Sequence, residues 1–294
     1  MGLFFSSDRF TRPGPGVRPD APRKKGVARL AEIMGRDMWN FFRAGFLAFL
    51  GCLPFIIGMF FAVETHALLF MLLAGIIGGL IAGPELSAMA DTVLRSLRDE
   101  PGYWWETYRR VWKRNARESL VPGMLTGLVL SMQIFTLFHM SVISAGIVTW
   151  VLLILSFLVT LGLESYIWPQ IALLDLPLYG ILKNSLLLFL GYLPRSLGAI
   201  AIKAVYWGAI LLFFPLTTII LPFTNFWLPM LPALLCIYQP LNKCFTIEST
   251  INKMREDDLN AALAKDNEPL PEDPPEKAEE STEASSDDSS SDVQ

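Results

Sequence analysis

The chain has 294 residues, of which 52% are hydrophobic, and its mean hydropathy is +0.42. This composition excludes an ordinary soluble domain and predicts an integral membrane protein. The net charge of −4 conceals two opposite parts, because residues 1–255 hold 22 basic and 14 acidic residues whereas residues 256–294 hold 2 basic and 14 acidic ones.

The basic residues of the first part lie beside apolar segments, so they predict membrane topology and not nucleic-acid binding. The three cysteines, Cys52, Cys236 and Cys244, lie inside apolar runs, and His66 and His139 have no metal-ligand spacing. The sequence contains no Walker loop, H-E-x-x-H or G-x-S-x-G motif. We therefore predict no metal, no cofactor and no catalytic residues.

In chain order, residues 1–25 are rich in Pro, Gly and Arg and are expected to be flexible. Residues 26–43 follow as an expected amphipathic, basic helix. Its apolar residues are expected to face the membrane: Leu30, Ile33, Met34, Met38, Phe41 and Phe42.

Six apolar stretches of about 20 residues then match the roughly 30 Å hydrocarbon core of a bilayer. They are Ala44–Val63, Ala67–Ala90, Leu120–Phe138, Val142–Leu163, Leu197–Leu221 and Phe226–Phe245. Glycines spaced four residues apart in the second and third stretches predict close helix packing; these are Gly75, Gly79, Gly83, Gly123 and Gly127.

Between the second and third stretches, Pro101 and Gly102 predict a break before a second surface helix. At helical spacing one arc of this helix is aromatic, namely Trp104, Trp105, Tyr108, Val111, Trp112 and Asn115. The opposite arc is mostly cationic, namely Glu106, Arg109, Arg110, Lys113, Arg114 and Arg117. We expect the helix to lie in the head-group plane with its basic face on anionic lipid, and Asn115 to make a structural hydrogen bond.

Residues 169–195 are harder to assign, because their apolar run, Leu186–Leu190, is too short to span a bilayer. A re-entrant or interfacial helix is the preferred interpretation, and a seventh span is the alternative. Residues 249–294 are acidic and rich in Pro and Ser, and we expect them to be a disordered tail.

Two runs resemble the YesL family of bacterial multi-pass membrane proteins. The first spans Gly83 to Asn115 and the second Tyr166 to Leu197. The matching motif residues are Gly83, Pro84, Gly102, Trp112, Asn115, Pro169, Asn184, Pro194 and Arg195. Glu85 departs from the family pattern, which has a small residue there. The resemblance covers residues 36–245 and implies a role beside carbohydrate uptake and utilisation, with a carbohydrate transport system as partner.

Four charged residues are expected at membrane depth, namely Glu85, Glu164, Asp175 and Lys203, and the possible polar site consists of Glu85, Glu164 and Lys203. Such charges are costly in hydrocarbon, by at least roughly 2.5–3.5 kcal/mol each, so they form either structural ion pairs at the interface or a polar site for a substrate or proton. Paired-carboxylate catalysis is the third alternative, without support from a nucleophile.

The distribution of basic residues predicts that both termini are cytoplasmic, in the plasma membrane of a bacterium. Nine basic residues precede the first span and seven lie between the second and third, whereas the links after spans one and three have none.

The predicted fold is an all-α, polytopic bundle of about six transmembrane helices at residues 26–248, with surface helices and a disordered tail. The predicted function is a non-catalytic accessory or regulatory component; a small solute transporter or channel is the alternative, and an intramembrane enzyme the third possibility.

Overall fold

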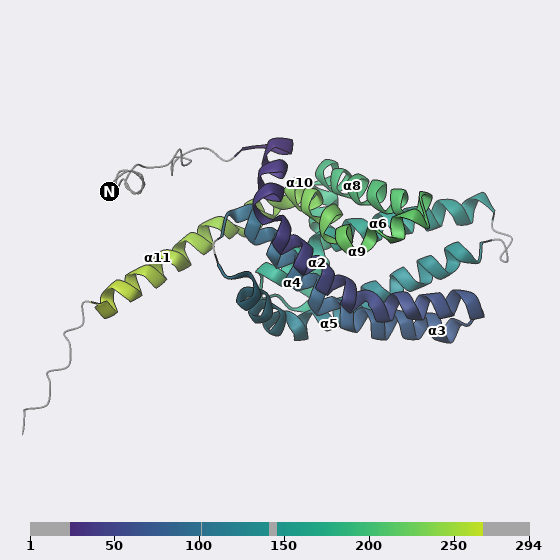
Figure 1. The fold of residues 1–294 in the computed structure, drawn as a ribbon. Coiled ribbons are helices and arrows are strands. Elements are labelled where there is room, and N and C mark those ends of the chain that lie inside the picture. Colours follow the sequence, from purple (N-terminus) through teal and green to yellow (C-terminus); the bar gives the residue numbers. More distant parts are fainter. Residues whose placement is uncertain (1–23, 101, 141–145, 267–294) are drawn as a thin grey trace, which may run out of the picture. The chain divides into compact units, whose positions relative to one another are not determined.

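The structure is a computed structural model that describes residues 24–100, 102–140 and 146–266, and these ranges contain helices and no strand. Six helical segments are long and apolar enough to cross a membrane, which confirms the predicted all-α bundle (Figure 1). They are α2 (Gly26–Thr65), the run Leu68–Arg98, α5 (Trp104–Phe138), α6 (Ile147–Leu173), α8 (Leu193–Leu212) and the run Leu221–Phe245.

Two of these segments are composite. The second consists of α3 (Leu68–Leu73), the π-helical turn η1 (Ala74–Gly78) and α4 (Gly79–Arg98). The last consists of α9 (Leu221–Thr224) and α10 (Trp227–Phe245), and the short 3₁₀ turn η2 (Leu216–Thr218) precedes it.

Helix α2 has 40 residues and continues through the boundary at which the sequence predicts a surface helix to end and a span to begin. The prediction of a separate membrane-facing helix at residues 26–43 is wrong. Ile33 and Phe41 have no exposed surface and contact other parts of the protein, whereas Met38 remains 57% exposed. No Pro lies between residues 26 and 53, so no proline interrupts the helix at the predicted boundary.

Helix α5 is likewise one helix of 35 residues, so the predicted surface helix is the first part of the third span. Its apolar arc does not face lipid as predicted, because Tyr108, Val111 and Asn115 are buried in the protein. Trp105, at the edge of the arc, is 58% exposed. The pattern correctly identified an apolar face, but hydropathy alone does not distinguish lipid from neighbouring helices.

Helices α4 and α5 touch backbone to backbone at the predicted glycines, which confirms their role in packing. A Cβ atom added at Gly79 would collide with the carbonyl oxygen of Gly123, and one added at Gly83 would collide with that of Ser119. Glycine removes the side chain from both surfaces, and the two helices therefore approach more closely than any other residue would permit.

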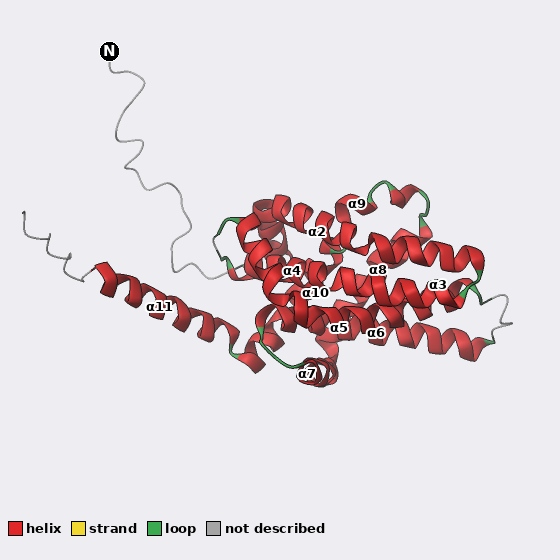
Figure 2. Ribbon diagram, turned by 90° about the horizontal axis from the view of Figure 1, so that it is seen from below, coloured by secondary structure: helices red, strands yellow, loops and turns green. Residues whose placement is uncertain are grey.

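Helix α7 (Leu178–Gly191) has 14 residues and a length of about 21 Å, which is too short to cross a bilayer. Figure 2 shows it nearly end-on, whereas α6 and α8 run across the view. Ser185 in α7 accepts a hydrogen bond from Gln170 of α6. Ser196, in the first turn of α8, is hydrogen-bonded to Tyr166, which lies one turn before Gln170 in α6. Helix α7 therefore lies across α6 at one level, as expected for an interfacial helix and not for a seventh span.

The chain divides after Glu248 into two compact units, and helix α11 (Ile247–Asp266) accounts for the described part of the second. The prediction of disorder from residue 249 onward is wrong as far as Asp266. This stretch has no Pro or Gly, and it contains Ala, Leu, Lys, Met and Arg, which favour helix. The remaining predicted tail, residues 267–294, and residues 1–23 lie outside the described ranges.

Candidate functional site

Glu85 in α4 is held by two side chains of α5. The hydroxyl of Tyr108 donates a hydrogen bond of 2.5 Å to one carboxylate oxygen, and Nε1 of Trp112 donates one of 2.9 Å to the other. Gly51 of α2 lies against the same side chain, since a Cβ there would approach Cγ of Glu85 to 2.6 Å. Glu85 is thus an interhelical contact whose two partners, Tyr108 and Trp112, are four residues apart on one face of α5.

Glu164 of α6 and Lys203 of α8 line one small cavity of about 10 Å³, together with Pro169 and residues of α10. Its volume is similar to that which one water molecule needs. The two opposite charges interact electrostatically, although no direct ion pair joins them in the described ranges. Glu85 does not line this cavity, so the structure unites only two of the three predicted polar residues.

The first turns of α2 and the turn between α4 and α5 are joined by ion pairs. Because this end of the bundle carries the arginines of residues 29–43 and 95–117, we call it the basic end. Asp99 accepts from Nη2 of Arg29 at 2.6 Å and forms a second pair with Arg36. Arg36 Nη2 also donates to the carbonyl oxygen of Ser96 at 2.8 Å. The network fixes the entry of the chain into the bundle against the α4–α5 turn.

The Asp99 ion pairs predict a pH dependence of stability. Burial alone would raise the pKa of Asp99, but hydrogen bonds from Arg36 and Arg29 outweigh it, so this pKa lies below the usual 3.8. A lowered folded-state pKa means that ionised Asp99 stabilises the fold above the unfolded-state pKa and that this contribution is lost as the pH falls through the folded-state value. We expect the melting temperature in detergent to fall more steeply below about pH 4 in the wild type than in Asp99→Asn. Equal slopes would contradict the assignment, and Glu106→Gln, at an exposed pair, is the matched control.

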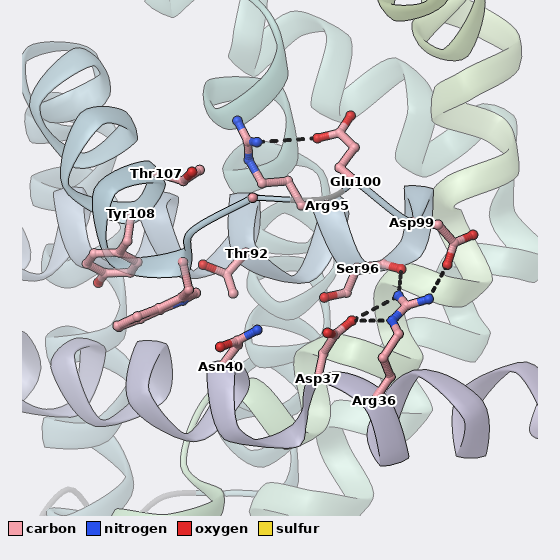
Figure 3. A pocket seen from close by; sticks show the side chains of 12 residues that line it. Arg36, Asp37, Asn40, Thr92, Arg95, Ser96, Asp99, Glu100, Thr107 and Tyr108 are labelled. Atoms are coloured by element: carbon pink, nitrogen blue, oxygen red, sulfur yellow. Dashed lines mark hydrogen bonds and ion pairs between the residues drawn. The ribbon is translucent and has the colours of Figure 1, made fainter. Parts of the chain in front are cut away.

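A cleft of about 330 Å³ opens beside this network, between α2, α4 and α5 (Figure 3). Tyr108 and Thr107 lie at one end of the view, Arg36 and Asp99 lie at the other, and Asn40 and Thr92 lie between them. Three carboxylates and two guanidinium groups are among its lining residues. This cleft could not be predicted from the sequence, because its walls come from three separate helices, and the spacing of residues within one helix does not show which helices are neighbours.

The YesL-like motif residues occupy structural positions at the α4–α5 interface and around α7. Gly83 and Pro84 are buried in α4, and Gly102 has a φ of 154°, which favours glycine. Pro169 lies inside α6, and Pro194 and Arg195 lie in the first turn of α8.

Asn115 and Asn184 have different surroundings. Asn115 is 1% exposed and its Oδ1 accepts from Nε of Arg114 at 3.0 Å, while the same guanidinium donates to the carbonyl oxygen of Ala172 in α6. Asn184 is half-buried, and the interhelical hydrogen bond of α7 is made by its neighbour Ser185. The two asparagines are therefore not equivalent, although each precedes an apolar run.

Two polar pairs were missed by the sequence analysis. At the end of the bundle opposite the basic end, Nδ1 of His66 and Nε2 of His139 lie 2.7 Å apart. In α4, the buried carboxylate of Asp91 accepts from Nε of Arg95 at 2.7 Å. The i, i+4 spacing of the second pair was a readable signal. The histidine pair joins residues 73 positions apart. The only signal for it in the sequence is that His66 follows the first span and His139 follows the third, so that both lie on the same side of the membrane.

Comparison with known proteins identifies no relative: no family model matches the chain, and neither does any curated protein or solved structure. The YesL resemblance therefore stays a prediction that rests on the motif residues alone.

Proposed function

We propose that the protein is a non-catalytic accessory or regulatory component of the bacterial plasma membrane. The supporting observation is that Glu85 has both carboxylate oxygens bonded to α5 side chains. A charge with two protein donors is used to hold helices together, as polar residues in membranes commonly are. Carbohydrate uptake or utilisation is the proposed setting, and it rests on the YesL resemblance.

We further infer that the basic end faces the cytoplasm, with both termini on that side. The exposed side chains of α5 there include Arg109, Arg110, Lys113 and Arg117. They form a cationic surface suited to anionic lipid or to an acidic segment of a partner such as a carbohydrate transport system.

A small solute transporter is the second candidate, and the cavity between Glu164 and Lys203 favours it. Opposite charges that share a cavity at span depth can exchange a proton or bind a polar group, and such residues often mark a transport path. The accessory proposal and the transporter proposal predict different solute flux by the purified protein.

The experiment is solute flux into liposomes that contain only this protein, measured with a panel of radiolabelled sugars. The accessory proposal predicts no flux above empty liposomes. Flux that Glu164→Gln abolishes without loss of folding would overturn it in favour of transport, and Glu106→Gln, at an exposed position, is the matched control.

Reversing charge at Arg109, Arg110 and Lys113 provides the complementary test. These substitutions should release a co-purifying partner or weaken membrane association, and the effect should shrink at high salt because exposed charges are screened. An unchanged set of co-purifying proteins and unchanged membrane association would contradict the proposed cationic surface.

A further inference from the structure

The cleft at the basic end contains polar atoms that the protein itself does not satisfy. Nε1 of Trp104 is buried and has no hydrogen-bond partner in the described ranges. Asn40 and the hydroxyl of Thr107 also line the cleft, and their side chains make no hydrogen bond within those ranges. A buried donor without a partner costs about 1–3 kcal/mol, so the indole N–H of Trp104 points to a bound group with acceptor oxygens. Asn40 and Thr107, which are only partly buried, offer further polar groups in the same cleft.

The Trp104 end of the cleft has a positive charge nearby. The guanidinium of Arg43 lies 5.0 Å from the ring centre of Trp39 and 5.7 Å from that of Trp104, and it makes no ion pair in the described part of the chain. Arg43 lies over the face of the Trp104 ring and does not itself line the cleft, but its positive charge, together with the unpartnered indole N–H of Trp104, suits a phosphate diester, which offers acceptors and a negative charge.

The other end of the cleft offers a negatively charged acceptor, the carboxylate of Asp37. Asp37 is 18% exposed, and only one of its carboxylate oxygens is used, by Arg36. The second oxygen is available to a donor. Since carboxylates outnumber guanidinium groups among the lining residues, a ligand that carries negative charge alone is disfavoured at this end. A primary ammonium suits Asp37, because it brings both a positive charge and N–H donors.

The surroundings of the cleft indicate where such a ligand comes from. Trp39 is 60% exposed and Trp105 is 58% exposed, and indole side chains concentrate at the level of lipid head groups. Met38, next to the lining residue Asp37, is 57% exposed and offers apolar surface for an acyl chain. The cleft volume of about 330 Å³ lies at the lower end of the range of small-molecule sites.

We propose that this cleft binds the zwitterionic head group of a phosphatidylethanolamine lipid, with the phosphate at Trp104 and Arg43 and the ammonium at Asp37. The site is distinct from the exposed cationic surface of α5, which would attract anionic lipid without selecting a head group. It gives the basic end a lipid-specific contact between α2 and α5, whose relative position the ion pairs of Asp99 also fix.

The test is native mass spectrometry of the full chain in detergent with equimolar phosphatidylethanolamine, phosphatidylcholine and phosphatidylglycerol of identical acyl chains. We expect the ethanolamine lipid to be retained about tenfold more than the choline lipid, because a quaternary ammonium has no N–H for Asp37. Asp37→Asn should abolish this preference. Trp104→Phe and Asn40→Ala should weaken retention of the ethanolamine and choline lipids alike, since neither substitution changes the contact of Asp37 with the ammonium.

The matched controls are Trp105→Phe and Glu106→Gln, exposed neighbours on the same helix that should leave retention unchanged. Size-exclusion profiles and melting temperatures identify variants that fold, and Asn40→Ala replaces Trp104→Phe if the latter does not. Equal retention of ethanolamine and choline lipids by the wild type would overturn the proposal. So would a preference that survives Asp37→Asn, or displacement of the lipid by free phosphoethanolamine at the lipid's own concentration, which would indicate a soluble ligand.

Discussion

Replacing Gly79 by Ala should destabilise the protein more than any other single-methyl addition to its spans. The new Cβ would meet the backbone carbonyl of Gly123, and a backbone atom cannot turn aside as a flexible side chain can. Overpacking of this kind typically costs 1–3 kcal/mol, and we expect about 3 kcal/mol here because α4 must separate from α5. The measurement is thermal or SDS-induced unfolding of the purified protein in detergent.

Gly208→Ala is the matched control for this substitution. Gly208 lies in the apolar helix α8, where an added Cβ would have no atom within 4 Å. Since Ala also favours helix more than Gly does, this variant should be as stable as the wild type or slightly more stable. Equal stability of the Gly79→Ala and Gly208→Ala variants would contradict the close backbone contact between α4 and α5.

The second large effect is expected at Glu85. Glu85→Leu removes the acceptor of both Tyr108 and Trp112 and leaves two donors in an apolar interface. Each unsatisfied buried donor costs about 1–3 kcal/mol, so we expect a loss of about 3 kcal/mol in the free energy of unfolding. Glu85→Gln keeps the shape and one acceptor oxygen and should lose about half as much.

A double-mutant cycle with Tyr108→Phe checks that the effect comes from this contact. The Tyr108→Phe substitution removes one of the two donors, so the Glu85→Leu change should cost less in its presence than in the wild type. Additive losses, or a Glu85→Leu variant that melts with the wild type, would show that Glu85 is not a structural acceptor. Its role would then have to be sought in transport.

The spans themselves could be predicted from the sequence, because about 20 consecutive apolar residues have few alternatives to crossing a bilayer. The packing glycines could be predicted as well, since a four-residue spacing of Gly75, Gly79 and Gly83 places them on one helix face. Even the short helix near Leu186–Leu190 was correctly separated from the spans by its length.

The environment of each face could not be predicted from the sequence. Ile33, Phe41 and Tyr108 were assigned to the membrane because the interior of a helix bundle and the interior of a bilayer are equally apolar. The arrangement of partners was also beyond local patterns. Tyr108 and Trp112 were read as an aromatic stripe, and nothing in their spacing indicates that their polar atoms meet Glu85 on another helix.

The residues of the candidate sites could be predicted in part from the sequence, but the contacts between them could not. Glu164 and Lys203 were predicted as charges at membrane depth, and the structure places them in one cavity, but their pairing depends on the contact between α6 and α8. The cleft with Asp37, Asn40 and Trp104 was not predicted at all. It forms only because α2 and α5 continue beyond the spans and enclose the end of α4.

We propose that the basic end of the six-span bundle is cytoplasmic and that helix α7 does not cross the membrane. Single cysteines at Glu64, Glu106, Tyr179 and Gly191, in a background without Cys52, Cys236 and Cys244, test it with a membrane-impermeant maleimide. All four positions are exposed in the structure. In intact cells only Glu64→Cys should be labelled, and the other three should react only after permeabilisation. Labelling of Tyr179→Cys and Gly191→Cys from opposite sides, or of Glu106→Cys in intact cells, would contradict the account.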